Sequence, residues 1–117
     1  APDGTYTLDN PLCGDRVTLD VRFRDGRISQ ISHVVRACLL CQASASIICA
    51  HAVGESMARI DEIMEAVRRM LKEDAALSGE AWPDLSAFTP VVAHKSRHQC
   101  VLLPFEALIK AGAGPPT

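Results

Sequence analysis

The sequence predicts an α+β domain, a small antiparallel sheet with helices packed on one face. Three observations support this fold class. Apolar and polar residues alternate over Val17–Phe23, the period-two pattern of a strand with one face on a core. Asp25-Gly26 follows, a dipeptide favoured in tight hairpin turns because both positions accept positive φ. From about Ser56 to Lys72, apolar residues recur instead at helical spacing.

The remaining strands are placed around that turn. Arg27–Val35 is predicted to be the returning strand of the hairpin, and its alternation breaks once near Gln30, which indicates a bulge or a twist there. Thr5–Leu8 is long enough for a short third strand, which Asn10-Pro11 ends.

Two helices should follow the hairpin directly. Cys41–Ala50 is a run of small and apolar residues that permits close approach to a sheet, and Gly54 marks a stop after it. The helix from Ser56 to Lys72 places apolar residues on one side and charged residues on the other.

The last third of the chain has a weaker pattern. Asp74–Pro90 is predicted to be a loop with one short turn around Leu85–Phe88. A final helix is expected from about Cys100 to Lys110, with Pro104 in its first turn, where a missing N–H costs little. Residues 111–117 are expected to form a flexible tail.

Length and composition limit the possible functions. The 117 residues suffice for one domain, taken as residues 1–117, and the net charge is −2. The chain has only five Phe, Trp and Tyr residues, and no stripe of basic residues is interleaved with them. A nucleic-acid partner therefore has little support. No apolar run approaches the roughly 18–20 residues that span a bilayer, and the first ten residues lack the order of a signal peptide. We therefore expect a cytoplasmic protein without a membrane partner.

The five cysteines carry the chemical signal. Cys13 and Asp15 flank Gly14 just before the first hairpin strand, and Cys38 follows the second, so the hairpin should bring Cys13 and Cys38 together. Cys100 heads the last predicted helix, which packing can bring to the same corner. Three thiolates and one carboxylate are suited to Zn²⁺ or to an iron–sulfur cluster, and an ionised thiol is also a good sulfur acceptor.

Other interpretations of the same cysteines remain open. Any one of them can be a buried small hydrophobe, and Cys49 within an apolar helix fits that description. Cys38-Leu-Leu-Cys41 has a common metal-ligand spacing, so Cys41 is an auxiliary candidate as an alternative ligand, a persulfide relay or a serine-sized replacement. We favour proximity of Cys41 to the site without obligatory ligation.

Three separated motifs resemble those of the NifU/IscU/SufU-type iron–sulfur cluster assembly scaffolds. They are Asn10-Pro-Leu-Cys-Gly-Asp15, Cys38-x-x-x-Gln42-Ala-Ser-Ala-Ser46 and Arg97-x-x-Cys100-x-Leu-Leu-Pro104, in the same order. Within that family the chain is most similar to the SufU branch, because the segment Asp74–Lys95 is long and Arg97 stands three residues before the last cysteine.

The resemblance implies a SufE/NifU-like fold and a non-enzymatic scaffold and sulfur acceptor. It implies Zn²⁺ or a [2Fe-2S] cluster on Cys13, Asp15, Cys38 and Cys100, with Cys100 as a persulfide acceptor. A cysteine desulfurase would be the sulfur donor, and iron–sulfur recipient proteins would be further partners. A zinc-dependent sulfurtransferase is the alternative within the same family.

Some residues depart from the family pattern. Cys41 stands where a serine or a similar residue is common, and Gln99 replaces the histidine that IscU-type members carry before the last cysteine. The Leu-Pro-Pro-Val-Lys chaperone-recognition segment of IscU-type members is absent, which argues against recognition by a dedicated Hsp70-type chaperone. Arg97 is an auxiliary candidate that could attract an anionic partner or sulfur species.

The histidines and carboxylates do not favour a water-activating zinc enzyme. That chemistry needs an open zinc position and usually a general base, and Glu106 is the only carboxylate that the sequence places near Cys100. His98 is expected to hydrogen-bond nearby, and His33, His51 and His94 are expected at surface positions. A small zinc-stabilised interaction module remains as a hypothesis of another class, in which metal removal unfolds the domain.

Overall fold

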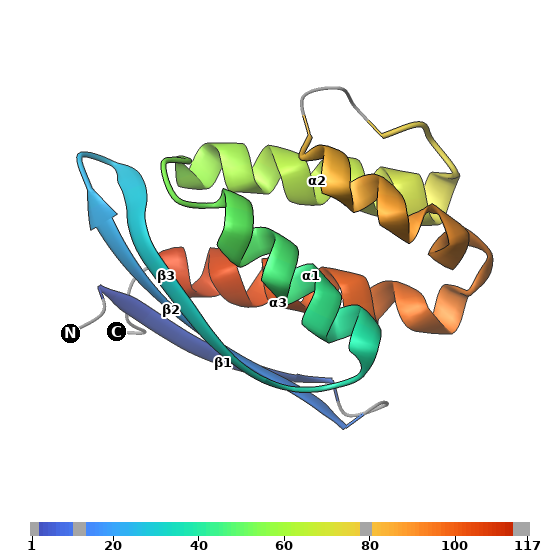
Figure 1. The fold of residues 1–117 in the computed structure, drawn as a ribbon, viewed down its shortest axis with the longest axis horizontal. Coiled ribbons are helices and arrows are strands. Elements are labelled where there is room, and N and C mark those ends of the chain that lie inside the picture. The colour runs from blue at the N-terminus through green and yellow to red at the C-terminus, as the bar shows by residue number, and fades with distance from the viewer. Residues whose placement is uncertain (1–2, 11–13, 78–80, 114–117) are drawn as a thin grey trace.

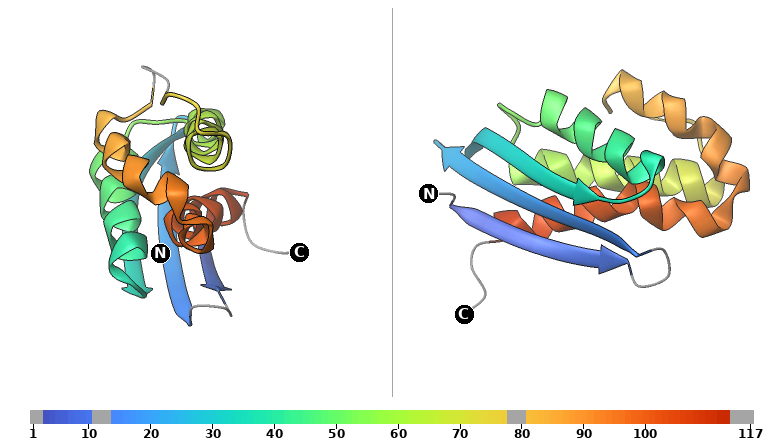
Figure 2. Two further views of the ribbon diagram at one scale, coloured as in Figure 1. Left: turned by 90° about the vertical axis from the view of Figure 1, so that its right-hand side faces the viewer. Right: turned by 60° about the horizontal axis from the view of Figure 1, so that its bottom comes forward.

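The computed structural model describes residues 3–10, 14–77 and 81–113. It is a three-stranded antiparallel sheet of order β1-β2-β3 with helices on one face (Figure 1). The strands are β1 (Gly4–Asn10), β2 (Asp15–Arg24) and β3 (Arg27–Arg36). Further views show the same layering, with the sheet on one side and the helices on the other (Figure 2). The predicted α+β class is confirmed.

The hairpin forms where it is predicted. Asp25 and Gly26 both have positive φ, 55° and 77°, and connect β2 to β3. The register shifts between Arg22 and Phe23, which face Gln30 and Ile28, so Ser29 is the extra residue of a bulge. The break in alternation near Gln30 therefore corresponds to a real irregularity.

One face of the sheet is buried by helices. Val17, Leu19 and Val21 of β2 are at most 1% exposed, while the residues between them are partly or fully exposed. Helices α1 (Leu39–His51) and α3 (His98–Gly112) pack on that face, and α2 (Met57–Glu73) packs against α3. Buried aliphatic side chains from all three helices and from β2 form the core.

The two helices after the hairpin match their predicted positions. Ser56 is the N-cap of α2, and its hydroxyl accepts a hydrogen bond from the Arg59 N–H at 3.2 Å. Helix α1 starts two residues earlier than expected, with Cys38 as its N-cap in extended conformation. Its small residues lie close to α3, as the hydrogen bond from the buried Ser44 hydroxyl to the Val101 carbonyl at 2.6 Å shows.

The last third of the chain differs from the prediction. Pro83–Ala93 forms a 3₁₀ helix, η1, and not a loop with one turn, because Leu85, Phe88 and Val91 are buried and fix it on the core. A short 3₁₀ helix, η2 (Lys95–Arg97), then leads into α3.

The bounds of α3 also differ from the prediction. This helix begins at His98, so Pro104 lies in its second turn and not in its first. The expected tail from residue 111 is wrong at its start, since α3 continues through the fully buried Ala111 to Gly112. Residues 114–117 lie outside the described residues. In the described part of the chain, each helix falls short of the length and apolarity needed to cross a membrane.

Candidate metal and sulfur site

Three of the predicted site residues converge at one corner of the sheet. Asp15 is the first residue of β2, Cys38 is the N-cap of α1, and Cys100 is the third residue of α3. A carboxylate oxygen of Asp15 and the two Sγ atoms all lie within 4.8 Å of one another. This spacing suits ligands of one metal centre, because atoms at about 2.0–2.3 Å from a common ion are themselves a few ångströms apart.

The register of the hairpin explains why Asp15 and Cys38 lie close together. Arg16 pairs with Arg36, so the start of β2 lies beside the end of β3, two residues before Cys38. The hairpin thus brings Asp15 beside Cys38, while the predicted contact of Cys13 with Cys38 stays a prediction. Cys13 lies outside the described residues.

Asp15 and Cys38 are held together by hydrogen bonds. The Cys38 N–H donates to Asp15 Oδ1 at 3.1 Å, and the Cys38 thiol lies 3.8 Å from Oδ2. The carboxylate is only 3% exposed. Asp15 thus fixes the N-cap residue of α1 as well as offering an oxygen ligand, a role that the sequence analysis did not anticipate.

The site cysteines differ in accessibility. Cys100 is fully buried, whereas Cys38 is partly exposed. Leu39, the next residue, is 82% exposed, which is unusual for a leucine beside a polar site. The exposure of Leu39 could be predicted from the sequence only because Leu39 lies outside the row of buried residues along α1. Of the two described site cysteines, Cys38 is thus the one exposed to solvent.

Cys41 lies in the core and outside the metal cluster. Its side chain is 0% exposed, and among the described residues only Asp15, Cys38 and Cys100 form a potential metal-binding group. That Cys41 lies near the site without obligatory ligation stays a prediction.

The auxiliary and histidine candidates lie elsewhere. Arg97 is exposed at the residue before α3. His98 is buried, and its Nε2 lies 3.1 Å from the carbonyls of both Val91 and Val92, so it ties α3 to η1. Its expected local hydrogen bonding is confirmed, and His94 is exposed as expected.

Two further histidines pair with neighbours on other elements. His33 Nδ1 of β3 lies 3.0 Å from Cys49 Sγ of α1, and His51 Nε2 lies 2.9 Å from an oxygen of Asp84. His51 also stacks on Trp82 with a centroid separation of 5.5 Å. Neither histidine belongs to the Asp15, Cys38 and Cys100 group, so both serve packing between elements.

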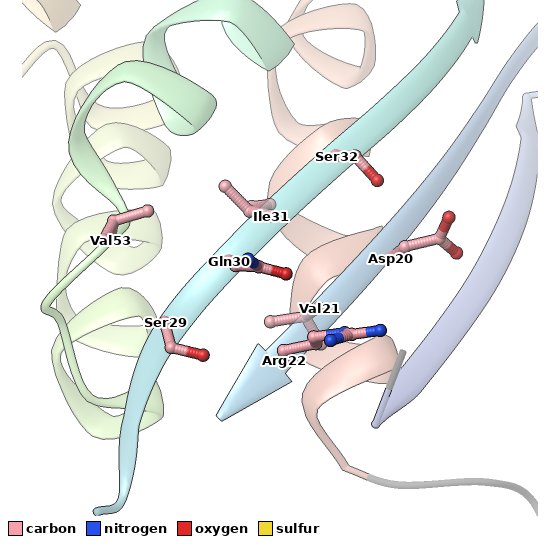
Figure 3. Close-up of a pocket in the computed structure, with 8 residues that line it drawn as sticks. All are labelled: Asp20, Val21, Arg22, Ser29, Gln30, Ile31, Ser32 and Val53. Carbon is pink, nitrogen blue, oxygen red and sulfur yellow. The ribbon is translucent and has the colours of Figure 1, made fainter. Parts of the chain in front are cut away.

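A separate hollow lies on β2 and β3 at the bulge (Figure 3). Polar side chains such as Asp20, Arg22 and Gln30 line it together with Val53. It contains no cysteine or histidine side chain, and Asp20 is its only carboxylate. The hollow thus lacks the thiolate set that makes the Cys38 corner chemically distinctive.

Comparison with known proteins decides the family. The family model described as the NifU-like N terminal domain matches residues 1–100. The chain belongs to the NifU-like N-terminal domain family. Its motif residues Asp15, Cys38 and Cys100, which are far apart in sequence, are those that the fold brings together.

Relatives in the NifU-like family carry scaffold names. The chain is similar to the iron–sulfur cluster assembly scaffold protein IscU of Thermotoga maritima, with 24% identity over 102 residues, 87% of this chain and 71% of the relative. It is also similar to IscU 1 of Archaeoglobus fulgidus, with 32% identity over 77 residues, 66% of this chain. It spans about half (47%) of the length of that archaeal relative.

Solved structures of the family share the fold. The N-terminal domain of a nitrogen-fixing NifU-like protein from Brucella abortus superposes with a TM-score of 0.88 and 36% identity, covering 95% of this chain and 77% of that one. A SUF-system scaffold protein from Fervidobacterium islandicum superposes with a TM-score of 0.86 at 24% identity, covering 94% and 80%, and shows the fold alone.

Proposed function

We propose that this chain is a scaffold on which iron–sulfur clusters are assembled, with the nascent [2Fe-2S] cluster as its cargo. The observation that carries the proposal is the convergence of Asp15, Cys38 and Cys100 within 4.8 Å from three different elements of a NifU-like fold. Thiolates are the ligands that iron–sulfur clusters prefer. Cys13, two residues before Asp15 in sequence, is the proposed fourth ligand.

Sulfur enters this site from a cysteine desulfurase in our proposal. Of the two described site thiols, the partly exposed Cys38 is the one that a donor can reach, whereas Cys100 is fully buried. We therefore place the arriving sulfur on Cys38 and keep Cys100, the acceptor expected from the sequence, as a ligand that receives it later. The exposed Leu39 beside Cys38 offers an apolar contact for the donor, and iron–sulfur recipient proteins then take the cargo.

A zinc-bound sulfurtransferase of the SufU type is the second candidate. Three thiolates and one carboxylate also satisfy tetrahedral zinc, and Arg97 stands three residues before Cys100, as in that branch. Zinc would then order the thiols for sulfur acceptance. A hydrolytic zinc enzyme has less support, because Glu106, the candidate base, accepts a hydrogen bond from Gln99 at 2.8 Å.

The test is anaerobic incubation with a cysteine desulfurase, cysteine and ferrous iron, read by visible spectroscopy and elemental analysis. Absorbance of a [2Fe-2S] centre with matched iron and sulfide supports the scaffold. Cys38→Ser should lose that centre, while Cys49→Ser, a matched cysteine change on the same helix, should keep it.

Other outcomes select the alternatives. Tightly held zinc without a cluster, together with faster desulfurase turnover, selects the zinc sulfurtransferase. A protein that forms no cluster, leaves the desulfurase rate unchanged and unfolds when a chelator removes its metal is a zinc-stabilised module.

A further inference from the structure

Cys38 and Cys41 form a dithiol across the first turn of α1. Cys38 is the N-cap and Cys41 is the third helical residue. Side chains at these two positions face each other, which is why they can exchange hydrogen bonds in a capping box. Here the Cys38 N–H already donates to the Asp15 carboxylate. The Cys41 side chain is therefore not needed to cap that N–H.

General helix geometry puts the two side chains close to disulfide spacing. Residues three apart on a helix have Cβ atoms about 5–6 Å apart, and a disulfide needs about 3.5–4.5 Å. The first turn has to shift to close this difference. The Cys38 side chain makes no cap hydrogen bond there, while the Gln42 N–H donates to the Cys38 carbonyl at 3.0 Å. The spacing Cys-x-x-Cys at a helix N-terminus is also that of dithiol redox proteins.

Their exposure assigns different roles to the two thiols. Cys38 is partly exposed, and Cys41 is 0% exposed. An external donor can therefore transfer sulfur to Cys38 and cannot reach Cys41. Cys41 in turn can reach the inner sulfur of a modified Cys38 from within the core.

We propose that Cys41 reduces the persulfide on Cys38 and so delivers sulfide at the assembly site. The inference rests on the proposed sulfur-accepting function and adds to it a source of electrons. A persulfide carries sulfur in the oxidation state zero, whereas a cluster contains sulfide, so two electrons are needed for each sulfur. The two thiol groups supply them.

The step balances without a further reagent. The sulfur of Cys41 attacks the inner sulfur of the Cys38 persulfide anion, and the terminal sulfur leaves as hydrosulfide with the proton of the Cys41 thiol. The bond between Cys38 Sγ and the terminal sulfur breaks, and the Cys38–Cys41 disulfide forms. The terminal sulfur is reduced by two electrons, and the two cysteines are oxidised. An external dithiol then reduces the disulfide for the next cycle.

The test uses inorganic polysulfide as the sulfur donor on the full, metal-free chain, without iron, oxygen or added thiol. Wild-type protein should lose the mass of two hydrogens, with peptide mapping locating a Cys38–Cys41 disulfide. Cys41→Ala and Cys41→Ser should instead keep a persulfide on Cys38, seen as the added mass of one sulfur. They should also release less sulfide than the wild type, because only the loading step from polysulfide then yields it. Two variants are used because a buried serine hydroxyl can impair folding, and circular dichroism checks both.

Cys49→Ser is the matched control and should behave as the wild type. Sulfide release by a folded Cys41→Ala protein at the wild-type rate would overturn the proposal, as would a disulfide from Cys38 to Cys100 or a persulfide that the wild type retains. Because iron and desulfurase are absent, a negative result here leaves the scaffold test unaffected. Failed cluster assembly, in turn, does not change the disulfide readout.

Discussion

Asp15 combines two roles in one buried side chain. Its carboxylate accepts the Cys38 N–H, and it is also the proposed oxygen ligand, within 4.8 Å of two cysteine sulfur atoms. Oxygen binds soft metals less firmly than thiolate does, so this ligand is the one that can leave first when cargo is handed over. The structural role and the ligand role can be separated by substitution.

Replacing Asp15 with Ala or with Asn separates the two roles. Both variants remove the carboxylate ligand, so both should hold a reconstituted cluster longer and transfer it more slowly to a recipient protein. The amide oxygen in Asp15→Asn can still accept the Cys38 N–H, whereas Asp15→Ala leaves that donor without an acceptor and should lower the free energy of unfolding by about 1–3 kcal/mol. Cluster lifetime by visible absorbance and urea unfolding give the two readouts. An unchanged lifetime in both variants would contradict the handover role.

Cys49 shows what burial does to a thiol away from the site. Its sulfur lies 3.0 Å from His33 Nδ1, and burial raises the pKa of the Cys49 thiol above its usual value. The neutral thiol is therefore favoured, and it can donate to the imidazole nitrogen. This contact joins α1 to β3, and ionisation of the thiol destabilises the fold because burial disfavours the thiolate.

The raised pKa of Cys49 predicts a pH dependence of stability. Because the folded-state pKa lies above the unfolded one, near 8.5, the contribution is complete below about pH 8.5 and is lost as pH rises through the folded value. Wild-type protein should therefore lose more stability than Cys49→Ala in urea unfolding between about pH 7 and about pH 10. Equal losses in the two proteins would show that the thiol does not titrate differently in the folded state.

At the scale of elements, η1 is held in place by α3. The buried His98 lies at hydrogen-bond distance from two carbonyls near the end of η1, and Leu85, Phe88 and Val91 of η1 enter the core. The segment before Cys100 is therefore anchored just ahead of the site. The position of Cys100 depends on this anchor, because His98 begins the helix that carries it.

Substitution of His98 tests the anchor. His98→Ala removes the donor to buried carbonyls and should lower the free energy of unfolding by about 1–3 kcal/mol. His94→Ala, an exposed histidine four residues earlier, should change it by less than about 0.5 kcal/mol. Urea unfolding measures both variants, and His98→Gln, which keeps an N–H donor, should recover part of the loss. Equal stability of the two alanine variants would argue against the anchor.

At the scale of the whole molecule, the first strand and the last helix lie against each other. Gly4 begins β1, and a Cβ atom there would overlap the carbonyl of Ala111 near the end of α3. This close approach lets β1 and α3 pack together. In the same region, Lys110 Nζ lies over the Tyr6 ring, 5.5 Å from its centroid. Both ends of the described chain thus contribute to one core.

Gly4→Ala should therefore destabilise the whole domain. The backbone of β1 or α3 has to move to admit the methyl group, at a cost of about 1–3 kcal/mol. Thr5→Ser, next to it on the exposed face, keeps the hydroxyl that donates to Asp20 and should change stability by less than about 0.5 kcal/mol. Thermal unfolding by circular dichroism compares the two. A stable Gly4→Ala protein would show that the contact between strand and helix is loose.

Local pattern predicted much of this fold correctly. Alternation defined β2, the Asp25-Gly26 turn fixed the hairpin, and helical spacing placed α2 to within one residue. The hairpin places the start of β2 beside the end of β3, so that Asp15 lies next to Cys38. These features depend on contacts within or between adjacent segments, so their signal lies in the local sequence.

What the sequence by itself determined is the class of the fold, the hairpin and the set of thiols and carboxylate suited to metal and sulfur. Only the tertiary structure decided that Cys100 joins Asp15 and Cys38 while Cys41 is buried in the core. It also decided that Pro83–Ala93 is helical and that Pro104 lies in the second turn of α3 and not in its first. The physical reason is that burial and convergence arise from packing between distant segments, and such packing leaves no periodicity in any one of them.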